Sequence, residues 1–197
     1  MQDLKDNQKG FTLIEAIVAT ALFAVTVSSI MGVYLSTLKI NRRTDVIRSA
    51  SENARYITGF LSKEIRNGQI DYYGPWSSPC SGTISSSASS LALVNTDSEH
   101  LCFYLGDSSG LASSSGTNLW LIKNNMAAVK INSSNVTINQ LLFYVSPTYN
   151  PYTTGSNAQP RVTIMGNVTA TSGSQDTITM PIQTTISIPS YDISTGP

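Results

Sequence analysis

The pattern of apolar and polar positions divides the chain into parts of different periodicity. Residues 11–38 are almost continuously apolar, and the 23 residues 16–38 include no charged side chain. At 1.5 Å per residue a helix of that length reaches about 34 Å, which exceeds the roughly 30 Å hydrocarbon core of a bilayer. The pattern therefore predicts a helix over residues 11–38 that is able to span a membrane.

Apolar residues continue beyond this segment at helical spacing, but on one face only. The stripe comprises Ile47, Ala50, Ala54, Ile57, Leu61 and Ile65. Spacings of three and four residues place these side chains on one side of a helix, where they can pack on a sheet. Asn67 followed by Gly68 is a plausible stop, because glycine commonly follows the last helical residue. We therefore expect one helix over residues 11–67, whose amphipathic half is residues 39–67.

After Gly68 the pattern changes to short segments of β character separated by turn residues. We expect strands at residues 91–95, 101–105, 119–123, 136–145, 162–170 and 178–188. The last two alternate apolar and polar residues, which is typical of half-buried antiparallel strands. The apolar phase shifts near Gln140, as at a β-bulge, and Pro181 lacks an N–H, which predicts an edge or bulged position. The fold class is therefore α+β, with residues 68–197 forming an antiparallel β globular domain.

Charge changes this picture in one respect. The chain has 12 basic and 12 acidic residues and only 12% charged residues, which excludes a strongly basic nucleic-acid binder, and we expect no nucleic-acid partner. Residues 39–66 nevertheless carry a net charge of +4. This basic segment could contact anionic lipid headgroups, although a solvated helix face is the simpler interpretation and the one we favour.

The junction between a polar leader and the apolar segment is the most specific motif. The leader MQDLKDNQKG runs directly into FTLIE, and this junction resembles the class III signal of type IV prepilins and type II secretion pseudopilins. The resemblance implies that a prepilin peptidase cuts between Gly10 and Phe11, removes residues 1–10 and methylates the new amine of Phe11. An ordinary secretory signal has a shorter apolar core that ends in a small-residue cleavage site, and this segment has neither feature.

Glu15 is the one charged residue within residues 11–38. A charge inside a membrane helix costs about 2.5–3.5 kcal/mol on insertion scales, so its presence indicates function. The resemblance implies an assembly role, in which Glu15 of an incoming subunit neutralises the Phe11 amine of its neighbour. Two alternatives stay open: Glu15 serves only the first turn of its own helix, where the dipole favours an acid, or it pairs with the amine of its own chain.

The apolar segment departs from the pattern of major pilins in its helix breakers. Those proteins often carry a glycine and then a proline within the segment, whereas this chain has Ala24 and Gly32. Glycine costs a helix about 1 kcal/mol and proline about 3, so local melting near Gly32 is permitted but not required. Flanking charges do not fix the orientation by the positive-inside rule, and we let the peptidase motif, which must face the cytoplasm, decide it.

The order of elements implies what the protein does. A long helix followed by antiparallel strands resembles the pilin fold, and the C-terminal pattern is similar to minor pilins of the W type and minor pseudopilins of the J type. The resemblance implies a structural subunit, without enzymatic activity or cofactor, of a type IV pilus, competence pilus or type II secretion pseudopilus. It would sit in the cytoplasmic membrane as a single-pass protein, with its globular domain outside the cytoplasm, before entering the filament.

The implied partners are other pilin or pseudopilin subunits, the prepilin peptidase, the inner-membrane assembly platform, and membrane lipid before assembly. The alternative is a membrane-anchored extracellular adhesin or binding protein that enters no filament. Its β domain would carry the recognition.

Cys80 and Cys102 are the two cysteines of the chain. Because the N-terminal motif places the domain outside the cytoplasm, we expect them to form a disulfide rather than remain buried thiols. Closing a loop of this size stabilises a fold by about 3 kcal/mol on the chain-entropy model. Major pilins commonly close a C-terminal loop instead, so this placement favours a minor or atypical member.

His100 is the single histidine, which excludes a multi-histidine metal site. Asp97, Glu99 and Asp107 lie near it in sequence and could be read as a calcium loop, but they lack EF-hand spacing. We therefore expect no metal site and interpret His100 as a surface residue at the start of a strand.

Overall fold

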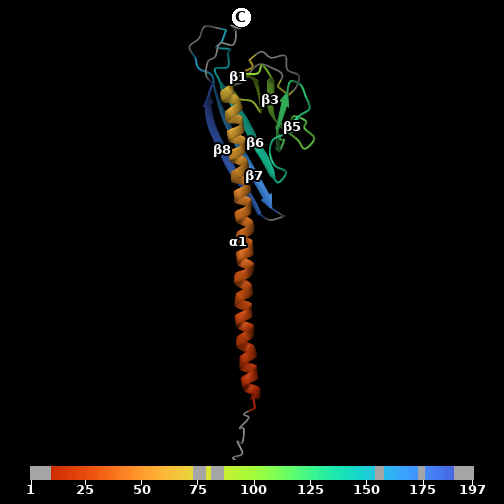
Figure 1. Cartoon of the computed structure of the whole chain (residues 1–197), viewed down its shortest axis with the longest axis vertical. Coiled ribbons are helices and arrows are strands. Elements are labelled where there is room, and N and C mark those ends of the chain that lie inside the picture. Colours follow the sequence, from red (N-terminus) through yellow and green to blue (C-terminus); the bar gives the residue numbers. More distant parts are fainter. Residues whose placement is uncertain (1–9, 73–78, 81–86, 154–157, 173–175, 189–197) are drawn as a thin grey trace, which may run out of the picture. The chain divides into compact units, whose positions relative to one another are not determined.

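The computed structural model describes residues 10–72, 79–80, 87–153, 158–172 and 176–188. The chain divides between Arg43 and Thr44 into two compact units. A single helix, α1 (Leu13–Asn67, 55 residues), contributes its first part to one unit and its second part to the other. The predicted helix over residues 11–67 is thus confirmed, with Phe11 and Thr12 preceding its first residue (Figure 1).

The end of α1 is fixed by a close backbone contact at Gly68. A Cβ atom on Gly68 would lie 2.9 Å from the carbonyl oxygen of Val94 and 3.0 Å from that of Glu64. Any larger residue would therefore push the helix end away from the neighbouring strand. Gly68, which the sequence predicts as the helix stop, thus also allows the chain to pair with the strand that contains Val94 directly after the helix.

The second part of α1 buries a stripe of side chains in the domain core. This stripe consists of Val46, Ala50, Ile57, Leu61 and Ile65. The predicted stripe differs in two places: Ile47 is 42% exposed and Val46 is buried instead, and Ala54 is only partly buried against the core. Val46 lies four residues before Ala50 and so continues the i, i+4 row along the helix, whereas Ile47 falls to the side of that row.

The strands are antiparallel, as the sequence predicted, and they form two sheets. The first sheet has the order β1-β2-β3-β4-β5. Its strands are β1 (Gly68–Ile70), β2 (Ser90–Asn95), β3 (His100–Gly106), β4 (Asn118–Lys123) and β5 (Val129–Lys130). The second sheet has the order β6-β7-β8, with β6 (Val136–Ser146), β7 (Arg161–Ser172) and β8 (Asp176–Ser187). The sequence missed β1 and β5, which are too short to show an alternating pattern.

Both special positions of the second sheet are confirmed. The register of β6 against β7 shifts between Ile138 and Gln140, which is the β-bulge expected there. Pro181 lies opposite Asn167 on β8, and β8 is the edge strand of its sheet. A residue without an N–H can occupy that position because the outer side of an edge strand has no ladder to support.

One hydrophobic core joins the two sheets to the second part of α1, beside which β6, β7 and β8 run in Figure 1. The sheets meet where Ala88 and Phe143 exchange backbone hydrogen bonds of 3.0 and 2.8 Å. Phe60 of α1 packs edge-on against Phe103 of β3, with ring centroids 6.0 Å apart. The domain core therefore needs the second part of the helix as one of its layers.

The loop between β5 and β6 ties the helix to both sheets. The Ser133 N–H donates to Asn53 Oδ1 of α1 at 3.2 Å, and Asn135 Nδ2 donates to Ser49 Oγ at 2.9 Å. Asn132, only 4% exposed, accepts a hydrogen bond from the Leu119 N–H of β4 at 2.9 Å. Its side chain thus satisfies backbone groups that the gap between the sheets would otherwise leave unpaired.

Candidate processing and assembly site

The proposed cleavage point lies in exposed, non-helical backbone. Gly10 and Phe11 both precede the first residue of α1, and the Phe11 side chain is 79% exposed. A Cβ atom on Gly10 would meet no atom within 4 Å. The bond between these residues is therefore open to an enzyme, and no part of the described chain covers it.

Thr12 caps the helix that begins after this bond. Its Oγ1 accepts a hydrogen bond of 3.3 Å from the Glu15 N–H, and its carbonyl oxygen accepts the first helical bond, 3.2 Å from the Ala16 N–H. Thr12 is therefore the N-cap, and Glu15 stands at the third helical position, where the helix dipole favours an acid. The sequence analysis gave Thr12 no role, although the T-x-x-E spacing is a capping-box signal that could have identified it.

The structure brings Phe11 and Glu15 into the same turn of chain at the start of α1. This proximity is compatible with both the intermolecular and the local roles of Glu15. The capping contact uses the backbone N–H of Glu15, so the carboxylate is not required for it.

The apolar part of α1 has no cover from its own chain. Residues 11–37 are all exposed, among them Leu13 (79%), Phe23 (70%) and Ile30 (69%). By length and composition this helix can cross a membrane, and its most apolar window has no buried residue. So large an exposed apolar surface marks an interaction site with lipid or with other protein chains.

Most serine and threonine hydroxyl groups in this segment donate within the helix. Five side chains donate to carbonyl oxygens three or four residues earlier: Thr20, Thr26, Ser28, Ser29 and Thr37. Donation of this kind removes the penalty of placing a hydroxyl in an apolar medium. The segment is therefore suited to a waterless environment despite its serine and threonine residues.

The helix continues without interruption through Gly32. A Cβ atom there would meet nothing within 4 Å, so no packing contact in the described chain requires glycine. Lys39, Arg42 and Arg43 follow the apolar segment as exposed side chains. The structure thus places a basic end on the apolar segment, as the sequence indicated.

The expected disulfide is confirmed. Cys80 and Cys102 are bonded, with Cα atoms 6.0 Å apart. Cys102 lies fully buried on β3, on the face opposite Phe103 and beside Tyr104. The bond therefore holds Cys80 against the face of the first sheet that Cys102 and Tyr104 share.

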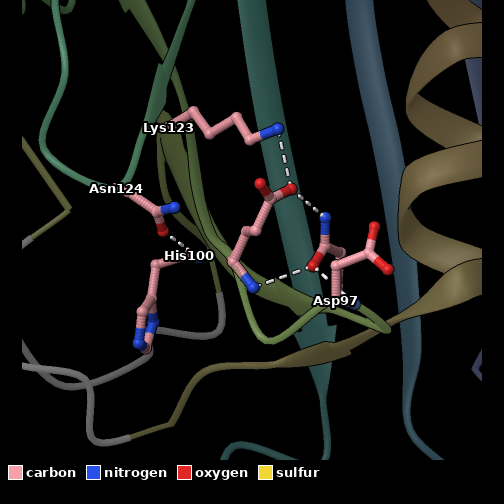
Figure 2. Close-up of polar contacts among 6 residues, drawn as sticks. Asp97, His100, Lys123 and Asn124 are labelled. Atoms are coloured by element: carbon pink, nitrogen blue, oxygen red, sulfur yellow. Dashed lines mark hydrogen bonds and ion pairs between the residues drawn. The ribbon is translucent and has the colours of Figure 1, made fainter.

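His100 and its acidic neighbours form local contacts at the β2–β3 turn (Figure 2). The Asn95 side chain accepts from the N–H groups of Asp97 and Glu99 at 3.0 and 2.8 Å and so shapes the turn. Glu99 Oε2 lies 2.7 Å from Lys123 Nζ. The hydrogen bond from Lys123, helped by one from Asn95, lowers the pKa of the Glu99 carboxyl. Figure 2 shows the His100 ring pointing away from this ion pair.

The remaining candidate ligands are also engaged elsewhere. His100 Nδ1 lies 3.2 Å from Asp71 Oδ2, beyond the end of β1. Asp107 shapes its own loop, where its carboxylate accepts hydrogen bonds from Ser109 and Leu111. The Ser109 hydroxyl is the main cause that lowers the pKa of Asp107. Across the described ranges, no group of three or more His, Cys, Asp or Glu side chains is placed to hold a metal ion.

Comparison with known families gives one match. Residues 5–31 match the family model of the prokaryotic N-terminal methylation motif. No curated protein and no solved structure matches the chain. The motif supports the class of type IV prepilins and pseudopilins, and it points to a structural subunit rather than an enzyme. Together with the apolar helix it fits single-pass anchoring in the inner membrane.

Proposed function

We propose that this protein is a prepilin-like subunit that enters a type IV pilus, a competence pilus or a type II secretion pseudopilus after cleavage. One observation carries the proposal: a fully exposed apolar helix, directly after the methylation motif, holds a single carboxylate at its start. The described part of the chain does not cover this helical segment, and the capping hydrogen bond at its start does not require the carboxylate. Packing of apolar helices from several subunits would give both the apolar surface and the carboxylate a partner.

Processing is proposed to occur between Gly10 and Phe11, followed by methylation of the Phe11 amine. Support comes from the position of this bond inside the matched motif and from its exposed, non-helical backbone. Cleavage would leave a short stub, Phe11 and Thr12, before the first helical residue. Thr12 would then keep its capping role in the mature chain.

Glu15 is proposed to neutralise the Phe11 amine of a neighbouring subunit during assembly. Two charges that are costly in an apolar medium would be neutralised together when the subunit docks. This pairing would also set the axial position of each subunit against the next.

The proposed subunit is a minor component. The disulfide lies in the first sheet, near the start of the domain, rather than near the C-terminus as is common in major pilins. Before assembly, the subunit would be anchored in the membrane by its apolar segment, with residues 44–197 outside the cytoplasm.

The test replaces Glu15 by Gln in the full chain, expressed in a host that assembles the filament. Gln keeps the size of the side chain and can serve at the third position of a capping box, but it lacks the charge. We expect normal cleavage and membrane insertion, with loss of the protein from sheared filaments. The conservative Thr12→Ser variant, which keeps the capping hydroxyl, should assemble normally.

Normal incorporation of Glu15→Gln would overturn the charge-pairing role and leave Glu15 as a helix-start residue. A full-length precursor that stays in the membrane, with no filament containing it, would favour the membrane-anchored binding protein instead.

A further inference from the structure

The outward face of the second sheet carries mainly neutral polar residues, with Leu142, Met165 and Pro181 among them and a single cation. Four adjacent rows cross β6, β7 and β8 in register. In order along the sheet they are Ser146, Arg161 and Ser187; Tyr144, Thr163 and Thr185; Leu142, Met165 and Gln183; and Gln140, Asn167 and Pro181. The side chains opposite to them, such as Phe143 and Ile164, fill the core. This face therefore does not serve the core of its own domain.

Two adjoining hollows lie along this face and share Tyr144. The larger, with a volume of about 620 Å³, is lined by Tyr144, Tyr149, Arg161, Thr163 and Thr185, together with the turn after β6. The smaller, about 430 Å³, continues over Met165, Asn167 and Gln183. Together they form an open cleft, which we call the β6–β8 cleft, along residues 140–146 of β6, a distance of about 20 Å at roughly 3.3 Å per residue.

The turn after β6, which forms one wall of the cleft, is held in place by Tyr72. Tyr72 donates its hydroxyl hydrogen to the Pro147 carbonyl oxygen at 3.0 Å, and its ring meets that of Tyr152 edge-on at 6.3 Å. Burial raises the pKa of the Tyr72 hydroxyl, so it stays protonated and remains a donor. The turn that carries Tyr149 is thereby anchored before any ligand arrives, which lowers the ordering cost of binding.

The floor of the cleft offers hydrogen-bonding groups in fixed positions. Thr163 Oγ1 and Thr185 Oγ1 lie 2.8 Å apart across β7 and β8. One hydroxyl of such a pair donates and the other accepts, so one hydroxyl hydrogen remains for a ligand. Tyr144, 37% exposed, presents an aromatic ring next to these hydroxyls.

Arg161 is the only charged residue in the four rows, all of which lie in the described part of the chain. Its side chain is exposed, and among the residues that the structure describes no carboxylate lines either hollow. A planar guanidinium in such a setting suits a carboxylate, which it can hold through two parallel hydrogen bonds.

We propose that the β6–β8 cleft binds an oligosaccharide that carries carboxylate groups. Hydroxyl and amide side chains match the hydroxyl groups of a sugar, the exposed tyrosine ring can lie against its C–H face, and Arg161 takes the carboxylate. A nucleic acid would require several cations along its phosphates, and this face has one. An extended peptide would join a strand edge, whereas this cleft lies on the face of the sheet, where polar and apolar side chains are mixed.

The test uses full-length protein in detergent micelles and measures binding to an immobilised trimer of galacturonic acid by interferometry. The neutral galactose trimer and a single-stranded oligonucleotide serve as alternative ligands. We expect binding to the acidic trimer above both alternatives. Arg161→Gln should weaken it about tenfold, because a hydrogen bond to a charged group is worth about 1.5 kcal/mol or more.

Lys130→Gln is the matched control, since it removes the same charge from an exposed residue on β5 of the other sheet. It should leave the affinity unchanged. The proposal is overturned if the acidic trimer does not bind, if the neutral trimer or the oligonucleotide binds as well as the acidic one, or if both variants lose affinity equally. Incorporation into filaments is not needed for this measurement, so the result is independent of the proposed function.

Discussion

The two parts of helix α1 differ in what covers their apolar side chains. In the second part, Ala50, Ile57 and Leu61 are fully buried by strands of the same chain. In the first part, Leu22 and Phe23 are 64% and 70% exposed although this part is the more apolar. The same helix thus has one half whose partner is encoded in the chain and one whose partner lies outside it. Lipid and neighbouring subunits are the partners that the methylation motif indicates.

The largest effect that separates the two parts should come from truncating one leucine in each. Leu61→Ala removes a fully buried side chain and should lower the free energy of unfolding of the globular unit by about 2–5 kcal/mol. Leu22→Ala should change it by less than about 0.5 kcal/mol, because Leu22 contributes nothing to that core. Urea unfolding of the detergent-solubilised protein, followed by tryptophan fluorescence, measures both. Equal losses in the two variants would refute the division of the helix.

The disulfide belongs only to the second unit and should stabilise only that unit. Replacing both Cys80 and Cys102 by Ala should lower its free energy of unfolding by about 3 kcal/mol on the chain-entropy model. The helical content of the apolar segment should not change. Reduction of the natural protein is the control, and mass analysis after alkylation, with and without reductant, verifies the bond. If reduction leaves unfolding unaltered, the bond does not contribute to stability.

A pair of glycines sharpens the same comparison. Gly68→Ala should destabilise the globular unit by about 1–3 kcal/mol, because the new Cβ meets backbone oxygens at 2.9 and 3.0 Å. Gly32→Ala should instead favour the helix by about 1 kcal/mol, since its Cβ meets no atom. Urea unfolding reports the first and far-UV circular dichroism the second. A destabilising Gly32→Ala in micelles would show that this position has a packing partner after all.

The fold could be predicted where long-range packing has a local signature. The helix, the bulge near Gln140 and the edge position of Pro181 followed from apolar periodicity and from the missing N–H of proline. The split into two sheets could not be predicted, because it depends on which strands pair with each other. The gap between the sheets, where Asn132 accepts a hydrogen bond from the Leu119 N–H, has no local signal in the sequence. Ile47 was misassigned for a similar reason, since spacing alone allows two adjacent residues at the start of a stripe.

The candidate site was predictable to a different degree. Glu15 stood out as one charge in an apolar segment, and Cys80 and Cys102 as the two cysteines. The capping role of Thr12 was missed, although the T-x-x-E spacing is a local signal for it. The β6–β8 cleft, which brings Tyr144 of β6 beside Arg161 of β7, has no local signal in the sequence. Only strand register places these residues together.

The smallest expected effect is on the stability of the globular unit at acid pH. Hydrogen bonds from Lys123 and Asn95 lower the pKa of Glu99 in the folded state. The stability gained from this is present above the ordinary pKa of a glutamate and is lost as the pH falls through the lower folded value. Glu99→Gln should therefore flatten the acid side of the curve of stability against pH. Asp97→Asn, an exposed acid two residues away, is the control and should leave that slope unchanged.

The most direct test of the account is the N-terminus of the protein recovered from sheared filaments. Peptide mass analysis should find a chain that begins at Phe11, with one methyl group added to its amine, and no trace of residues 1–10. Recovery of a chain that still carries residues 1–10, or one that begins at another residue, would contradict the central claim.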